Sequence, residues 1–131
     1  MTGCWVIVCG PSGAGKDSVI GWAQAALARH PRVRFARRLV TREAHPASDH
    51  EPVSAGEMQA LRARGALAWH WEAHGCAYGV PQACADAVAD GKVVVVNGSR
   101  AHALSLADCD NVRCVLVTAP DPLLRQRLQA R

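Results

Sequence analysis

Short apolar runs alternate along the chain with longer segments in which apolar residues recur at helical spacing. The apolar runs are typical of buried strands and lie at residues 4–9, 92–96 and 112–117. The segments with helical spacing lie at residues 16–29, 82–90 and 122–131. A further strand is expected at residues 35–40. Because strands that alternate with helices build parallel sheets, the pattern predicts an α/β fold with a parallel sheet flanked by helices.

The alternation is interrupted at about residues 42–80, where the pattern predicts a small insertion. Ser54 and Glu57 have the spacing of a capping box, which predicts a helix over residues 55–64 that ends at Gly65. The chain is therefore expected to form a single domain over residues 1–131, with its core at 1–41 and 81–131.

A strand is expected at residues 66–73, inside the insertion. Successive side chains of a strand point to opposite faces, so Trp69 and Trp71 share one face while His70 and Glu72 share the other. One of these pairs is expected to pack in the core, and the other to face solvent or ligand.

A glycine-rich segment joins the first predicted strand to the first predicted helix, which is the context of a phosphate-binding P-loop. It reads Gly10-Pro11-Ser12-Gly13-Ala14-Gly15-Lys16-Asp17-Ser18. Its backbone N–H groups and the helix N-terminus would surround the phosphates of ATP, and Lys16 would reach the β- and γ-phosphates. Asp17 stands where Ser or Thr commonly binds Mg²⁺, so Asp17 and Ser18 are the expected metal ligands. A glycine-rich turn that binds nothing is the alternative, which the flanking elements and the lysine disfavour.

Residues suited to a second phosphate group are expected at the same edge of the sheet. The valine run at 93–96 leads directly into Asn97-Gly98-Ser99-Arg100, and ligands of open α/β sheets gather at the carboxyl ends of strands. Arg42 and Tyr78 belong to the insertion that would cover this edge. Arg42, Tyr78 and Arg100 together predict a second phosphate pocket facing the first, although each of them alone could equally be a surface or packing residue.

The composition narrows the class of protein and its partners. No apolar stretch is long enough to span a membrane and no signal peptide is evident, so we expect a cytoplasmic protein without a membrane partner. The net charge of +4 depends on arginine, since only Lys16 and Lys92 are lysines among 15 basic residues. Arginine suits phosphate groups. A nucleic-acid partner ranks below a small phosphorylated substrate because no long basic helix or aromatic-basic motif is present.

The cysteines and histidines do not form an evident catalytic or metal-binding set. The 6 cysteines have neither a Cys-x-x-Cys pair nor zinc-site spacing, and they are expected to be reduced and mostly buried. No Ser/His/Asp or Cys/His arrangement stands out either, which suits phosphoryl transfer, where alignment and charge neutralisation do most of the work.

Over its whole length the chain resembles the guanylate kinase-like branch of P-loop phosphotransferases. The resemblance is carried by the P-loop, Val40-Thr41-Arg42, the run from Glu72 to Gly79 and the segment 124–131. It implies that Arg42 and Tyr78 hold a substrate phosphate.

The residues that read guanine in that branch are replaced here. Trp69 stands in place of an acidic residue, Val80 in place of Ser or Thr, and His45 in place of a second phosphate-binding arginine. Asn97 and Ser99 stand in place of two aspartates. A guanine base would leave its polar edge unpaired in such a site, so guanine is disfavoured as a substrate.

A narrower resemblance is to the ribose 1,5-bisphosphate phosphokinase family. It rests on Gly15-Lys16-Asp17-Ser18, Arg38 with Thr41-Arg42, Tyr78-Gly79-Val80 and above all the Asn-Gly-Ser-Arg run at 97–100. The resemblance implies ATP- and Mg²⁺-dependent phosphorylation of ribose 1,5-bisphosphate to 5-phosphoribosyl 1-diphosphate in phosphonate catabolism. It further implies that Lys16 acts on the transferred phosphoryl group. The implied substrate ligands are Arg38, Arg42, Tyr78, Asn97 and Arg100, with Asn97 on a ribose hydroxyl.

Members of that family continue into a lid with further arginines and a last core strand. Arg131 resembles the first lid arginine, and the resemblance implies a catalytic role for it. The expectation is a fold without its last strand and most of its lid, with weak or absent turnover and partly retained ATP binding.

Two other functions are open at the level of sequence. One is a nucleoside monophosphate kinase in which Trp69 stacks on a base. The other is a non-catalytic guanylate kinase-like binding module, which the intact Gly15-Lys16 argues against and the short lid argues for.

Overall fold

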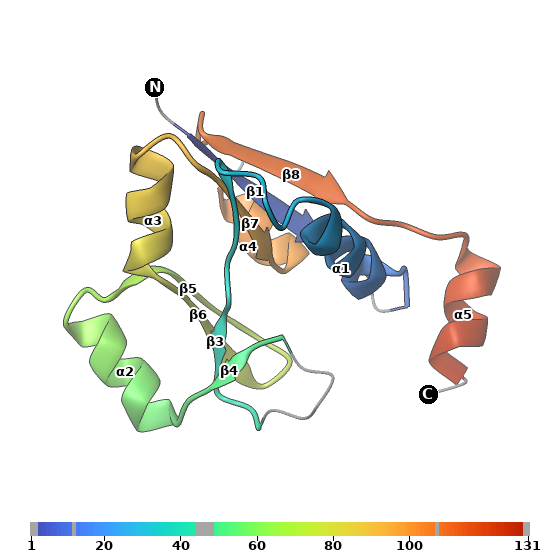
Figure 1. Ribbon diagram of the computed structural model, residues 1–131. Helices are drawn as coiled ribbons and strands as arrows, with labels where there is room; N and C mark the ends of the chain where they lie inside the picture. The colour runs from blue at the N-terminus through green and yellow to red at the C-terminus, as the bar shows by residue number, and fades with distance from the viewer. Residues whose placement is uncertain (1–2, 12, 44–48, 107, 130–131) are drawn as a thin grey trace.

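A parallel sheet of 4 strands forms the centre of the computed structural model, which describes residues 3–11, 13–43, 49–106 and 108–129. Its strands, in spatial order, are β2 (Val33–Phe35), β7 (Val93–Asn97), β1 (Cys4–Cys9) and β8 (Val112–Leu116). The carboxyl ends of β1, β7 and β8 lie at one edge, since Val8 is paired with Asn97 and Cys9 with Leu116. This confirms the predicted parallel sheet (Figure 1).

A second, mixed sheet of 4 strands is built largely from the insertion. Its spatial order is β4 (Glu51–Pro52), β3 (Leu39–Val40), β6 (Cys76–Pro81) and β5 (Leu67–Ala73). The prediction of one strand through residues 35–40 is wrong, because β2 and β3 belong to different sheets. The backbone stays with the first sheet as far as Ala36, whose N–H donates to the carbonyl of Val95, and β3 then pairs with β6.

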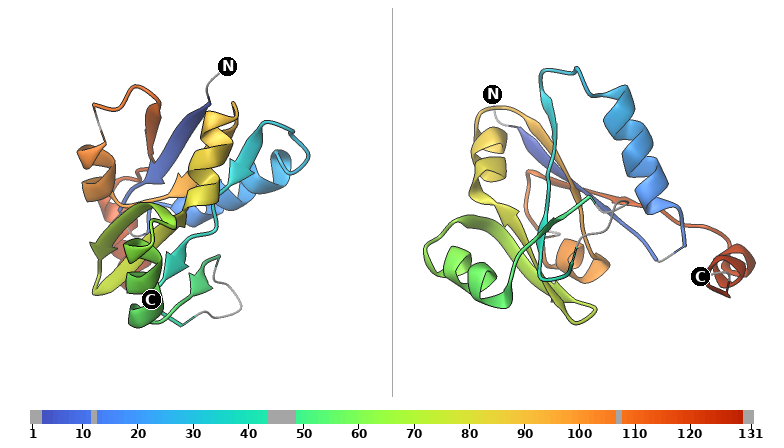
Figure 2. Two further views of the ribbon diagram at one scale, coloured as in Figure 1. Left: turned by 90° about the vertical axis from the view of Figure 1, so that its left-hand side faces the viewer. Right: turned by 60° about the horizontal axis from the view of Figure 1, so that its bottom comes forward.

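The described helices are α1 (Lys16–Ala26), α2 (Ala55–Ala63), α3 (Gln82–Ala89), α4 (Arg100–Ser105) and α5 (Asp121–Gln129). Helices α1 and α4 lie against β1 and α3 lies against β7, whereas α2 lies against β5 and β6 of the second sheet. The short helix α4 was not predicted; it begins where the Ser99 hydroxyl accepts a hydrogen bond from the His102 N–H at 3.1 Å. Within the ranges that the structure describes, none of the helices has the length and apolar character needed to cross a bilayer. Figure 1 and the right-hand view of Figure 2 show α5 set apart from the two sheets.

The capping box at the start of α2 is confirmed. The Ser54 hydroxyl accepts from the Glu57 N–H at 3.0 Å, and the Glu57 carboxylate accepts from the Ser54 N–H at 3.1 Å. These two bonds satisfy N–H groups that the helix itself cannot. The bond from the Ser54 N–H also lowers the pKa of Glu57, because it favours the ionised carboxylate.

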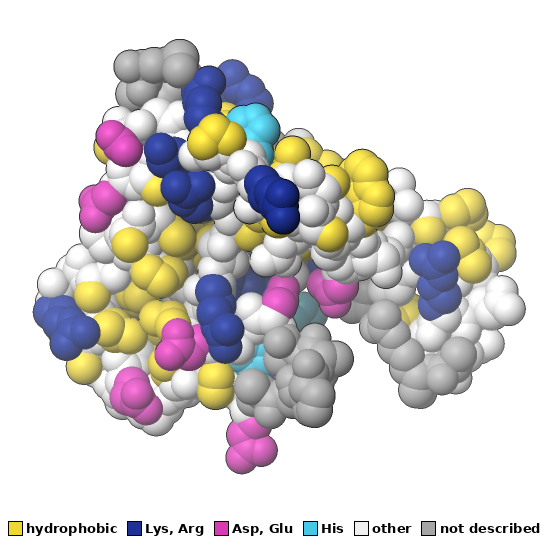
Figure 3. Space-filling view, viewed as in Figure 1, with side chains coloured by type: hydrophobic (Ala, Val, Ile, Leu, Met, Phe, Trp, Pro, Cys, Tyr) yellow, Lys and Arg dark blue, Asp and Glu magenta, His cyan; other side chains and the backbone are white. Residues whose placement is uncertain are grey.

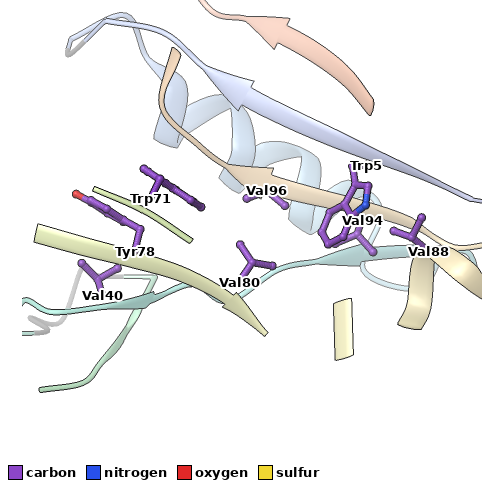
Figure 4. Close-up of a cluster of buried hydrophobic side chains, with 8 residues drawn as sticks. All are labelled: Trp5, Val40, Trp71, Tyr78, Val80, Val88, Val94 and Val96. Atoms are coloured by element: carbon purple, nitrogen blue, oxygen red, sulfur yellow. The ribbon is translucent and has the colours of Figure 1, made fainter. Parts of the chain in front are cut away.

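The main hydrophobic core lies between the two sheets. Figure 4 shows it running from Trp5, Val94 and Val88 at one end to Trp71, Tyr78 and Val40 at the other. Val94, Val96, Val40 and Val80 are fully buried. Since residues of both sheets contribute, burial of apolar surface fixes the second sheet against the first.

The expectation that most cysteines are buried is wrong. Cys9 is buried, Cys4, Cys76 and Cys84 are half-buried, and Cys109 and Cys114 are exposed. Cys114 lies on β8, an edge strand that also exposes Val115 and Leu116. All 6 are free thiols, as expected.

Gly98 offers a test of this packing. A Cβ at Gly98 would lie 2.7 Å from the Cγ2 atom of the fully buried Ile7. Gly98→Ala should therefore lower the free energy of unfolding by about 1–3 kcal/mol, the usual cost of an overfilled core. Urea denaturation measures this difference.

Gly21→Ala is the matched control, because Gly21 lies within α1 and a Cβ there would have nothing within 4 Å. This change should leave the protein equally stable or more stable, since alanine favours helix. Equal stabilities for the two variants would contradict the packing described around Gly98.

Candidate functional site

The segment between β1 and α1 has the backbone of an anion-binding loop. Gly10, Gly13 and Gly15 have φ values of 156°, 86° and 96°, a region that side chains rarely adopt. A Cβ at Gly10 would also lie 2.2 Å from the carbonyl oxygen of Val117. Gly15 is the N-cap of α1, and among the described residues no side chain caps the helix there. The first backbone N–H groups of α1 are therefore available to a ligand.

Two adjoining cavities bring most of the predicted site residues together. The first, of about 310 Å³, is lined by Pro11, Gly13, Gly15, Lys16, Asp17, Ser18, Arg38, Arg42, His74, Tyr78 and Asn97. The second, of about 520 Å³, shares Lys16, Arg38 and Tyr78 with the first and adds Arg100. Ala14 is buried beneath the loop. The predicted residues Ser12 and Arg131, and also His45, lie outside the described residues.

The pairing of β3 with β6 positions Arg42 and Tyr78. Val40 is paired with Tyr78, and the Ala77 N–H donates to the Thr41 hydroxyl at 2.8 Å while the Thr41 N–H donates to the Ala77 carbonyl at 3.1 Å. The carbonyl of Arg42 is in turn 3.1 Å from Nε2 of His50. A carbonyl can only accept, so Nε2 carries the proton there. These contacts fix the backbone positions of Arg42 and Tyr78.

Arg38 and Lys16 bring positive charge into a partly desolvated site. The Arg38 side chain is only 12% exposed; it lies over the Tyr78 ring, 5.2 Å from its centroid, and 3.7 Å from the Asp49 carboxylate. Burial lowers the pKa of Arg38 and that of Lys16, although Asp49 and Asp17 respectively act against this. Both side chains line the two cavities and present positive charge there, which favours an anionic ligand.

Asp17 and Asn97 are in direct contact, although 80 residues separate them in the sequence. The Nδ2 atom of Asn97 donates to Oδ1 of Asp17 at 3.2 Å. Asn97 is 8% exposed, and its own Oδ1 is buried with no hydrogen-bond partner in the part of the chain that the structure describes. The contact links the end of β7 to the first turn of α1.

Trp71 and Tyr78, which line the second cavity, belong to an aromatic stack. The rings of Trp5 and Trp69 are stacked with centroids 4.0 Å apart, and His102 lies between Trp69 and Trp71, edge-on to the first at 5.2 Å and stacked on the second at 4.4 Å. Trp71 continues the stack onto Tyr78 at 5.4 Å. The prediction that one of the two side-chain pairs of this strand packs is therefore confirmed, and the packed pair is Trp69 and Trp71. Trp69 is engaged in the core by Trp5 and is not presented to a base.

Several residues at the site were missed by the sequence analysis. Asp49 pairs with Arg38, and His50 holds the backbone of Arg42. His74 lines both cavities from the tip of the β5–β6 hairpin, where it has a φ of 53°. Arg127 of α5 donates to the carbonyl of Gly13 in the P-loop. The adjacent His74-Gly75 pair was an available signal, because a two-residue hairpin loop of type I′ requires positive φ at both positions.

Charge is dispersed on the face of the molecule seen in Figure 3. Lys and Arg side chains there lie in separate groups among hydrophobic and acidic ones. A nucleic-acid backbone is bound by a continuous basic surface. This face therefore does not favour the nucleic-acid alternative.

Comparisons with known proteins give a matching family and several relatives. Residues 6–131 match the family described as "AAA domain". The chain is 45% identical over 127 residues to ribose 1,5-bisphosphate phosphokinase PhnN of Rhodopseudomonas palustris, covering 96% of this chain and 66% of that protein. It is 42% identical to PhnN of Methylobacterium radiotolerans, covering 100% of this chain and 75% of that protein.

The fold is also similar to a solved structure. The crystal structure of guanylate kinase from Anaplasma phagocytophilum superposes with a TM-score of 0.76 at 21% identity, covering 96% of this chain and 66% of that one. At this identity the likeness establishes the guanylate kinase-like fold alone.

The buried stack predicts a pH-dependent stability. Burial lowers the pKa of His102 below the ordinary value of 6.5, and its Nε2 atom finds no hydrogen-bond partner within the described ranges. As the pH falls through about 6.5, the unfolded chain takes up a proton that the folded protein resists, so the free energy of unfolding should decrease. Above that pH both states hold a neutral ring, and this contribution should be constant.

Urea denaturation at about pH 5.5 and 7.5 measures this effect, with 6.5 as the reference value for histidine. The loss of stability at the lower pH should be smaller in His102→Gln than in the wild type. An equal loss in both proteins would show that His102 is not its source.

Proposed function

The chain belongs to the ribose 1,5-bisphosphate phosphokinase family, and from this we propose that it transfers the γ-phosphoryl group of ATP to the 1-phosphate of ribose 1,5-bisphosphate. The products would be ADP and 5-phosphoribosyl 1-diphosphate, as in phosphonate catabolism. The observation that carries the proposal is that one cavity is lined both by the P-loop lysine and by Arg38, Arg42 and Tyr78. Because the chain spans 66% of the Rhodopseudomonas palustris relative, the activity is proposed for the site and not taken over from that protein.

The residues present fit ATP with Mg²⁺. The glycine loop and the uncapped start of α1 supply N–H donors for phosphate oxygens, and Lys16 supplies a charge beside them. Asp17 and Ser18 are exposed oxygen ligands next to that lysine, as a hard cation prefers. When bound, Mg²⁺ would neutralise part of the charge on the transferring phosphates.

The acceptor side fits a small molecule with phosphate groups at both ends. Arg38 and Tyr78 line both cavities, whereas Arg42 lines only the first and Arg100 only the second. Arg42 and Arg100 are exposed and able to reach a ligand. Arginine binds phosphate in a bidentate manner, so these groups would hold two polyanions close together against their mutual repulsion.

The reaction requires little acid–base chemistry from the protein. The attacking atom is a phosphate oxygen that is already anionic, so no base has to remove a proton. Alignment and charge neutralisation are then sufficient, and Lys16 with the arginines would provide them. Arg131 is proposed as a further catalytic arginine from its resemblance to the first lid arginine.

A nucleoside monophosphate kinase is the less favoured alternative. That function required Trp69 to stack on a base, but this ring is stacked on Trp5 and contacted by His102. The other alternative, a non-catalytic binding module, has no use for the glycine cradle and Lys16. We further propose a cytoplasmic location, which suits the 6 free cysteines.

Replacing Lys16 tests the nucleotide site. Lys16→Ala should weaken ATP binding by roughly 10- to 100-fold, the usual loss for a charged hydrogen bond, while the fold is retained. Calorimetric titration of Mg²⁺-ATP measures the affinity. Lys92→Ala is the matched control, because Lys92 is the second of 2 lysines in the chain and pairs with Asp90 at 4.0 Å, away from both cavities. Equal losses in both variants would refute the role of Lys16.

Tyr78→Phe tests the acceptor site. The change removes one hydroxyl but keeps the ring that stacks on Trp71 and lies beneath Arg38. Affinity for ribose 1,5-bisphosphate should fall by roughly tenfold, with ATP affinity unchanged. Calorimetry with each ligand separates the two effects, and a loss of ATP affinity alone would contradict the assignment.

A substrate comparison tests the choice of acceptor. With Mg²⁺-ATP present, ribose 1,5-bisphosphate should bind and be consumed in preference to guanosine monophosphate, whose base would find no polar partners. Detection of ADP and binding calorimetry provide two independent readouts. The reverse preference would favour a nucleoside monophosphate kinase.

A further inference from the structure

The contact between Asn97 and Asp17 has a defined orientation. A carboxylate can only accept, so the group that faces Asp17 must be the NH₂ of the amide, and the Asn97 carbonyl oxygen must face away. That oxygen is buried and has no hydrogen-bond partner among the described residues, which is an unusual state for a polar atom in a protein interior. Within this part of the chain the amide is thus held on one side by Asp17 and has no partner on the other.

Asn97 is a rigid anchor, whereas Asp17 is an exposed side chain. Asn97 is the last residue of β7, is paired with Val8 of β1 and is 8% exposed. Asp17 lies in the first turn of α1 and is exposed to solvent. A hydrogen bond from a fixed amide restricts the rotamers of the carboxylate before any ligand binds, so the entropy of ordering it is not lost on binding.

At Asp17 and Asn97 the acidic and the uncharged side chain stand in the reverse of the arrangement common in P-loop proteins. In those proteins a Ser or Thr hydroxyl after the P-loop lysine and an Asp at the end of a neighbouring strand hold Mg²⁺. Here the carboxylate follows the lysine, as Asp17, and the uncharged side chain ends the neighbouring strand, as Asn97. These two positions together still carry one acid, but here it lies on the helix and not at the end of the strand.

We propose that Asn97 is a positioning residue, which holds the Asp17 carboxylate in the orientation that binds the Mg²⁺ accompanying ATP. This inference rests on the proposed function and deepens it. It gives Asn97 a task other than contact with a ribose hydroxyl. It also explains why a carboxylate is tolerated in the phosphate-binding loop, since the carboxylate faces an amide donor.

The competing explanation is that the contact merely ties α1 to the sheet. A structural tie would affect stability in the same way with or without metal. If Asn97 positions Asp17, its replacement should change only the part of ATP binding that depends on Mg²⁺. The ratio of ATP affinity in Mg²⁺ to that in excess EDTA therefore separates the two explanations.

The test is calorimetric titration of ATP in both buffers for the full chain and its variants. The wild type should bind ATP more tightly in Mg²⁺ than in EDTA. Asn97→Ala should keep its affinity in EDTA within about twofold and lose roughly 10- to 100-fold of the Mg²⁺ enhancement, as for other groups that orient a metal ligand. An unchanged enhancement in Asn97→Ala, or none in the wild type, would overturn the proposal.

Gln82→Ala is the matched control. Gln82 and Asp86 form the same kind of amide–carboxylate hydrogen bond, at 3.4 Å, on the exposed surface of α3 and outside both cavities. Its removal should leave both affinities unchanged. Equal losses of the Mg²⁺ enhancement in Gln82→Ala and Asn97→Ala would overturn the assignment to Asn97.

The exchange itself can be reversed. Asp17→Ser alone should lose the Mg²⁺ enhancement, and Asp17→Ser combined with Asn97→Asp should recover at least tenfold of it, since the acid then stands at the end of β7. A folded double variant that recovers nothing would overturn the proposal. If thermal unfolding shows that the double variant does not fold, the Asn97→Ala comparison decides.

Failure of the proposed function is distinguishable from failure of this inference. Absence of ATP binding by the wild type in both buffers would overturn the nucleotide site and the positioning role together. ATP binding with a metal enhancement that Asn97→Ala leaves intact would overturn the positioning role alone.

Discussion

The parallel pairing of β1 with β7 is the constraint on which the candidate site depends. It brings the carboxyl end of β7 beside the loop that leaves β1, with Val8 opposite Asn97. A shift of one residue in this register would turn Asn97 to the opposite face of the sheet, away from Asp17. The buried valines of β7 and the close approach of Gly98 to Ile7 both hold the register in place. Packing in the core therefore determines that Asn97 and Asp17 lie in contact at the edge of the sheet.

The second sheet acts as a platform that carries the arginines toward the P-loop. Its position does not depend on polar contacts alone, because Trp71, Tyr78 and Val80 are buried in the core shared with the central sheet. Tyr78 has a double role, since its ring is part of that core while it also lines both cavities. Stability and ligand binding are thus coupled through a single side chain.

The elements with strong local signals could be predicted from the sequence. The glycines of the P-loop, the capping box at Ser54 and the apolar strands all depend on neighbouring residues, and the structure has each of them. The break between β2 and β3 could not be predicted, because it depends on which distant strand each short segment meets. The same holds for Asp49, His50 and Arg127, whose partners Arg38, Arg42 and Gly13 are set by the tertiary fold.

The predominance of arginine around the cavities has a consequence for how the site responds to acidity. A guanidinium group stays protonated throughout the physiological range, and such groups line both cavities, with Arg38 in each of them. A phosphate monoester, in contrast, loses its second proton near pH 6. For a sugar phosphate bound at these arginines, loss of that proton would add a second negative charge, so the ligand's own ionisation would strengthen its attraction to the site as the pH rises through this range.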